Sequence, residues 1–148
     1  EEGGGFTTGT PWEALNDNFR EFTVNQQDPD PASLLNHYRA LIHLRNQHPA
    51  LRTGDFLPLT CSCSQVYPVL RVEGDEIILV LANLSRKELE GCTFSIEESP
   101  LSREYSIDVL FGEGDFPPII FDENGGLVEW TLPKNMAPWE SFVLKLSK

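Results

Sequence analysis

Three pairs of adjacent acidic residues are the first candidates for chemistry in this chain: Asp75–Glu76, Glu97–Glu98 and Asp122–Glu123. Two carboxyl groups that converge on one glycosidic bond can hydrolyse it, one as acid and the other as base or nucleophile. Each pair is predicted to lie at a strand end or in a turn, and neighbours in a strand point to opposite faces. We therefore interpret all three pairs as solvated turn acids.

The three histidines, His37, His43 and His48, fall within one predicted helix. The spacing of His37 and His43 is not the i, i+4 spacing that presents two ligands on one helix face. His48 lies near the helix end, where a positive charge suits the helix dipole. We interpret these residues as exposed or capping histidines. The sequence also contains no G-x-S-x-G elbow and no P-loop.

The cysteines Cys61, Cys63 and Cys92 cannot all form pairs with one another. Cys61 and Cys63 point to the same face if they share a strand, and a bridge between such close neighbours is strained. Cys92 can meet either of them across a sheet, and the sequence leaves this open. Zinc sites usually need four ligands in a recognisable frame, which is absent. We expect small core or surface cysteines, no metal and no cofactor.

Aromatic residues are the remaining candidates, because they can form stacking platforms for sugars. Core packing is expected for Trp130, in a predicted strand, and for Trp139, beside Pro138. Trp12 lies in residues 1–28, a glycine-rich stretch without periodicity that also carries Phe6, Phe19 and Phe22. These aromatics argue against plain disorder. They either cover a core or line a site, and both readings stay open for Trp12.

Composition limits the partners of this 148-residue chain. Its formal net charge is −12, from 23 acidic and 11 basic residues, and such a surface repels nucleic acid and anionic membranes. No apolar run approaches the length of a membrane span. We expect no nucleic-acid partner and no membrane partner. The start, EEGGGFTTG, has no initiator Met and resembles the middle of a longer polypeptide. The cellular compartment stays open.

The clearest element is a helix within Asp28–Leu51. Asp30 is the predicted N-cap and Pro31 the first helical residue. Pro49 disfavours helix at His48 and ends the element. Apolar residues recur at helical spacing and spread over about half of the circumference, which is wide for contact with one sheet: Leu34, Leu35, Tyr38, Leu41, Ile42 and Leu44. A helix on a single sheet and a helix between two bodies are both possible; we favour the second.

After a turn at residues 52–55, the spacing of the apolar residues changes from that of a helix to that of β-strands. Gln65–Val72 and Glu76–Leu84 are predicted to form a hairpin through Glu73–Gly74–Asp75, with Glu76–Leu84 as a central strand. Pro68 suggests an edge or a bulge. Further strands are predicted at Thr93–Ile96, Tyr105–Leu110, Pro118–Phe121, Leu127–Leu132 and Ser141–Leu146, with a turn at Asn124–Gly125–Gly126. Short strands at this spacing predict an antiparallel β-sandwich.

Several motifs together resemble the α-amylase family of glycoside hydrolases. They are GFTTGTPWEALN at residues 5–16, VNQQ at 24–27, DPASLLNHYRALIHLRNQHPALRTGDF at 30–56 and VYPVLRVEGDEIILVLANLS at 66–85. The helix motif S-L-L-x-x-Y-R-x-L-I-x-L-R with P-A-L-x-x-G after it is specific. The sandwich part alone is a weak signal. The resemblance covers essentially the whole chain.

The resemblance implies that residues 1–51 are the last loop and last helix of a (β/α)8 catalytic barrel. Residues 52–148 would then be the C-terminal β-sandwich. Family members cleave or transfer α-glucosidic bonds with retention, using an Asp nucleophile, a Glu acid/base and a further Asp. Those residues lie on earlier barrel strands, so none can be assigned here. Phe6 and Trp12, in a loop on the active-site side, are the implied substrate-binding candidates.

Our hypothesis is therefore a mainly β fragment with a structural role in an α-amylase-like enzyme on starch-type glucans, and without activity of its own. Its expected partners are the catalytic barrel and, in the parent, the α-glucan. The wide apolar stripe of the helix also suggests a homodimer of the fragment. The alternative is a carbohydrate-binding β-sandwich module, which exposed coplanar aromatics would favour. A free-standing regulatory protein fits the start of the chain less well.

Overall fold

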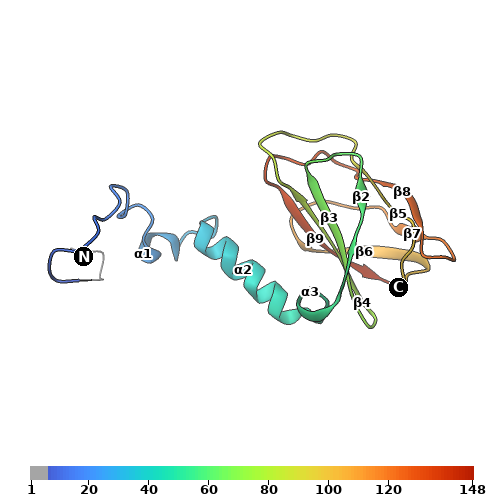
Figure 1. Cartoon of the computed structure of the whole chain (residues 1–148), viewed down its shortest axis with the longest axis horizontal. Helices are drawn as coiled ribbons and strands as arrows, with labels where there is room; N and C mark the ends of the chain where they lie inside the picture. The colour runs from blue at the N-terminus through green and yellow to red at the C-terminus, as the bar shows by residue number, and fades with distance from the viewer. Residues whose placement is uncertain (1–6) are drawn as a thin grey trace. The chain divides into compact units, whose positions relative to one another are not determined.

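The computed structural model describes residues 7–148 and contains two compact units, divided along the chain between Leu44 and Arg45 (Figure 1). The first unit holds α1 (Val24–Gln27) and most of α2 (Leu34–Gln47). The second holds the end of α2, then α3 (Pro49–Thr53) and the strands. Within residues 7–148, no helix has the length and apolar character needed to cross a membrane.

The second unit is an antiparallel β-sandwich, as the sequence predicts. Its strands are β1 (Asp55–Pro58), β2 (Thr60–Cys61), β3 (Val66–Glu73), β4 (Glu76–Asn83), β5 (Thr93–Ile96), β6 (Arg103–Phe111), β7 (Ile119–Phe121), β8 (Leu127–Thr131) and β9 (Ser141–Ser147). The larger sheet has the order β1-β3-β4-β9-β6-β7, and the smaller has the order β2-β5-β8. All seven strands placed by sequence are present. The short β1 and β2 are additional.

The predicted hairpin is confirmed in register. Glu73 pairs with Glu76, so Gly74 and Asp75 alone form the connection, and Gly74 has the positive φ of 57° that such a turn favours. β4 lies between β3 and β9, as expected of a central strand. Pro68 lies in the interior strand β3, and the residue pairing of β3 with β1 ends one residue later in the chain, at Val69. Its missing N–H therefore interrupts no pairing with β1.

The core lies between the two sheets. Leu70, Leu79 and Leu144 from the larger sheet are fully buried in one cluster with Phe94 and Trp130 from the smaller. The Phe94 and Trp130 rings are 5.8 Å apart between centroids. Burial of several large aromatic and aliphatic side chains at about 1.5–3 kcal/mol each is the main stabilising contribution of this unit.

The start of the long helix differs from the prediction. α2 begins at Leu34, and Asp30 instead accepts a hydrogen bond from the Ala32 amide at 2.9 Å within the preceding turn. The Ser33 hydroxyl accepts from the Asn36 amide at 3.3 Å, and the Gln27 side chain accepts from the Leu35 amide at 3.0 Å. Ser33 and Gln27 therefore satisfy the first helical amides in place of Asp30. The predicted stop is correct, because α2 ends at Gln47 and α3 begins at Pro49.

The segment before α2 contains one helical turn that the sequence analysis did not predict. α1 spans only Val24–Gln27, and the Thr23 hydroxyl accepts from the Gln26 amide at its start. The Gln27 carbonyl accepts from both Ser33 and Asn36, which ties this turn to the beginning of α2. A four-residue helix has no clear apolar periodicity, so only these contacts define it.

Candidate functional site

α3 is attached to the larger sheet by a group of polar contacts around Glu76, the first residue of β4. Glu76 Oε1 is 2.7 Å from His48 Nδ1, and Glu76 Oε2 accepts from the Ala50 amide at 2.8 Å. Arg71 Nε donates to the Ala50 carbonyl at 3.1 Å. Ala50 is itself fully buried. One carboxylate and one guanidinium thus fix the backbone of α3 on β3 and β4.

These contacts correct two sequence interpretations. Glu76 is not a solvated turn acid, because its side chain is only 19% exposed, and His48 is not simply an exposed or dipole-stabilised residue. Burial acts to raise the pKa of the Glu76 carboxyl, but the hydrogen bonds from Ala50 and His48 outweigh burial and hold that pKa below its ordinary value. The charged carboxylate is therefore the form that stabilises this attachment.

The other acids behave as expected. Asp75 is exposed and pairs with Lys148, whose hydrogen bond and charge lower the pKa of the Asp75 carboxyl. Glu97 and Glu98 are exposed. Asp122 Oδ1 accepts from the amides of Asn124 and Gly126 at 2.8 Å each, and so closes the predicted turn. The geometry pairs none of these adjacent carboxylates for acid–base catalysis.

The outer face of the larger sheet is apolar, although it points away from the core cluster. Paired residues share a face, so the register places Val69, Val80 and Val143 in one row there, next to Ile78. Ile78 is fully buried and lies outside the core cluster. A sheet with apolar residues on both faces is typical of a strand layer covered on both sides.

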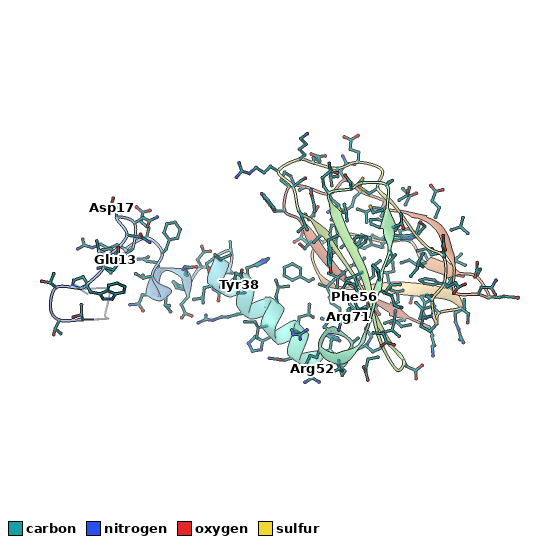
Figure 2. All side chains as sticks on the ribbon, viewed as in Figure 1. Glu13, Asp17, Tyr38, Arg52, Phe56 and Arg71 are labelled. Atoms are coloured by element: carbon teal, nitrogen blue, oxygen red, sulfur yellow. A yellow bond between two sulfur atoms is a disulfide. The ribbon has the colours of Figure 1, made fainter. Side chains whose placement is uncertain are left out.

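Two aromatic residues border this outer face. Phe56 is 51% exposed and Tyr67 is 46% exposed. Their rings are 6.5 Å apart but tilted by 46°, so they do not form a flat platform. Arg71 lies over the Phe56 ring at 5.9 Å, and Figure 2 labels both side chains where β1 and β3 run together.

α2 leaves much of its apolar side exposed. None of its 14 residues is buried. Leu34 is 66% exposed, Tyr38, labelled in Figure 2, is 58% exposed and Ile42 is 56% exposed. The histidines His37 and His43 on this helix are exposed as well, as the sequence suggests. Large contiguous apolar surfaces usually mark interaction sites.

The burial of the tryptophans agrees only in part with the prediction from sequence. Trp130 is buried, as expected, and its Nε1 donates to the Pro117 carbonyl. Trp139 is 61% exposed and has a φ of 62°, so the expectation that it lies in the core is wrong. Trp12 is 97% exposed. Phe6 lies outside the described residues.

The cysteines include one disulfide, between Cys63 and Cys92, which the sequence left open. These two residues are therefore not isolated core or surface thiols. Cys61 is the free cysteine, and burial raises the pKa of its thiol, with a hydrogen bond from the Cys63 amide acting in the opposite direction. The disulfide depends on the pairing of β2 with β5, which local sequence patterns do not specify.

Comparison with known proteins supports the resemblance seen in the sequence. Residues 1–54 match the model of the family described as "Alpha amylase, catalytic domain". The oligo-1,6-glucosidase of Bacillus cereus is 30% identical over 143 residues, which is 96% of this chain and 23% of that protein. The trehalose-6-phosphate hydrolase of Bacillus subtilis (strain 168) is 29% identical over 99% of this chain and 24% of that protein.

Solved structures give the same result. The trehalose-6-phosphate hydrolase of Bacillus licheniformis has a TM-score of 0.69 with 28% identity, over 100% of this chain and 24% of that one. The isomaltulose synthase of Erwinia rhapontici NX5 has a TM-score of 0.66 with 30% identity, over 97% of this chain and 23% of that one. The chain thus spans about a quarter of the length of the relatives it matches.

Proposed function

Since this chain belongs to the α-amylase family of glycoside hydrolases, we propose that it is the C-terminal part of an enzyme acting on α-glucosidic bonds of starch-type glucans. In this proposal its role is structural. Residues 1–51 complete the catalytic barrel with its last loop and helix, and residues 52–148 form a sandwich that covers the barrel. The catalytic Asp and Glu residues belong to the part of the enzyme that precedes these residues.

The observation that carries this proposal is the largely exposed apolar side of α2, in a segment that matches the family's catalytic domain. Burying a leucine contributes about 1.5–3 kcal/mol, so a helix that exposes Leu34, Tyr38 and Ile42 gains most of its stabilisation from a partner. A barrel supplies such a partner.

The shared region does not determine the reaction. Two relatives are named as hydrolases, whereas the Erwinia protein is named as a synthase of isomaltulose. All of them share with the chain a region of about a quarter of their own length. Similarity to the chain therefore does not distinguish specificity for α-1,6 bonds, for a phosphorylated disaccharide or for transfer, and we assign the chain to none of these.

The activity of the purified chain tests the structural role. We expect no release of reducing sugar from starch or maltotriose and no cleavage of a chromogenic α-glucoside, because in this proposal the catalytic Asp and Glu residues belong to another part of the enzyme. A glycosidase with known activity on each substrate serves as the positive control. Turnover that co-purifies with the chain through a second chromatographic step would contradict the proposal.

A second candidate function rests on Trp139. This side chain is 61% exposed at the rim of the sandwich, and its amide donates to the Ser85 carbonyl at 3.2 Å. Leu84, next to Ser85, is 60% exposed. An exposed indole held by backbone contacts can stack on a sugar ring, which favours a carbohydrate-binding role.

Titration with β-cyclodextrin and maltoheptaose, followed by isothermal titration calorimetry, separates the two functions. A purely structural role predicts no saturable binding at micromolar ligand, in the wild type or in Trp139→Ala. Saturable binding that Trp139→Ala abolishes and Trp12→Ala retains would establish the carbohydrate-binding function instead. Loss of binding only in Trp12→Ala would move the sugar contact to the N-terminal loop.

A further inference from the structure

The three cysteines form one cluster at the edge of the sandwich. The Sγ atoms of Cys61, Cys63 and Cys92 all lie within 4.8 Å of one another. Cys92 is fully buried, and the other two are partly buried against the core cluster. Two of the three sulfurs form the disulfide. Every cysteine of the sequence therefore lies in this one place.

Contacts other than the disulfide hold this cluster together. β2 pairs with β5, with Cys61 opposite Phe94. The Ser62 amide donates to the Thr93 carbonyl at 3.0 Å, and the Thr93 amide donates to the Ser62 hydroxyl at 2.9 Å. These hydrogen bonds hold Ser62, which precedes Cys63, against Thr93, which follows Cys92, whether or not the disulfide is formed.

We propose that reduction of the Cys63–Cys92 disulfide converts this cluster into a binding site for a thiophilic metal ion of the Zn²⁺ class, with Cys61, Cys63 and Cys92 as its three protein ligands. Zn–S bonds of about 2.3 Å in a tetrahedron place sulfur atoms about 3.8 Å apart, which these sulfurs reach by side-chain rotation once the disulfide is open. Thiolate ligands select Zn²⁺ and Cu⁺ over Mg²⁺ and Ca²⁺.

The two states are mutually exclusive. A dithiol reductant passes two electrons and two protons to the disulfide, which gives two cysteine thiols and leaves the reductant as its own disulfide. Binding of one metal ion then forms three metal–sulfur bonds and releases the three thiol protons to solvent. The fourth position is open to water or an external ligand. This inference is independent of the role in a glycosidase.

Zinc binding by the phosphine-reduced chain tests the proposal. Equilibrium dialysis should give about one Zn²⁺ per reduced wild-type chain. Affinity should fall at least tenfold in Cys61→Ser, because only two thiolates remain. Ser64→Ala, an exposed neighbour, should bind as the wild type does. The oxidised wild type has the same acidic surface and should not bind at this affinity, which excludes binding by surface carboxylates.

Two results would overturn the site. One is equal zinc affinity in Cys61→Ser and wild type, and the other is equal affinity in oxidised and reduced wild type. Thermal unfolding of oxidised Cys61→Ser, which keeps the disulfide, verifies that the variant is folded. If reduction unfolds the chain, recovery of its near-ultraviolet circular dichroism on adding Zn²⁺ to wild type but not to Cys61→Ser supports the proposal, and no recovery refutes it.

Discussion

Glu76 illustrates how far the role of a residue depends on its distant contacts. In the sequence it follows Asp75 in a hairpin turn, and both look like surface acids. In the fold, Asp75 remains 91% exposed, whereas Glu76 accepts from the Ala50 amide and contacts His48, 28 residues earlier in the chain. The attachment of α3 to the sheet therefore depends on this carboxylate together with the Arg71 guanidinium.

Replacing Glu76 with Gln should destabilise the sandwich at neutral pH by about 1.5–3 kcal/mol, since a charge-assisted hydrogen bond to the Ala50 amide is weakened and the contact with His48 loses its charge. The pKa of the Glu76 carboxyl is lowered on folding, so its contribution is present above the unfolded value of 4.5 and is lost as the pH falls through the folded value. Urea unfolding of both proteins across this range measures the effect.

In this experiment the difference between wild type and Glu76→Gln should shrink as the solution is acidified. Asp75→Asn, at the adjacent exposed position, is the matched control and should change stability little. A difference that stays constant from neutral to acidic pH would show that the loss is due to packing and not to the charge of Glu76.

At the scale of elements, Asn36 ties the segment before α2 to the helix through several hydrogen bonds. Asn36 Nδ2 donates to the carbonyls of Gln27, Asp28 and Asp30, at 3.0, 3.0 and 2.8 Å. Arg39 adds an ion pair with Asp28. These contacts lie within the first unit, so they hold residues 27–33 on the helix independently of the sandwich.

Asn36→Ala should release this turn. We expect faster amide exchange and earlier proteolytic cleavage in residues 27–33, because three carbonyls each lose the hydrogen bond from Asn36, while the unfolding midpoint of the sandwich stays the same. Asn46→Ala, an exposed asparagine on the same helix, should leave both properties unchanged. Equal lowering of the sandwich midpoint by Asn36→Ala would show that the two units unfold together.

At the scale of the whole molecule, the chain presents surfaces that suit a larger body. It spans about a quarter of its relatives, and the apolar side of α2 is exposed. When the chain is purified alone, exposure of the apolar side of α2 to water is unfavourable. Another copy of the chain is then the most accessible apolar partner.

The isolated chain should therefore associate as its concentration rises, through α2, most simply as a two-fold dimer. Sedimentation velocity at several concentrations should show this. A variant with Gln in place of Leu34, Tyr38 and Ile42 should stay monomeric, because the apolar contact is removed. A wild-type chain that remains monomeric at high concentration, with α2 still helical, would rule out this mode of association.

Local patterns in the sequence were sufficient for much of the fold. Pro49 ends α2 because its ring disfavours helix at His48, and Gly74 permits the two-residue turn between β3 and β4. The apolar run of β4 predicted a strand covered on both faces. These signals act between residues close in sequence, so they can be read without knowing the rest of the fold. The family resemblance was equally visible in the helix motif.

The tertiary structure decided the features that depend on distant residues. Cys63 and Cys92 are 29 residues apart, and only the pairing of β2 with β5 brings them together. Trp139 is exposed because its backbone, at a φ of 62°, bonds to Ser85 from another loop. Ser33 replaces Asp30 at the start of α2 because Gln27 and Asn36 fold the preceding turn onto the helix. The first two outcomes depend on contacts between distant segments, and the third depends on how a short turn folds back, so residue types and spacing alone do not specify them.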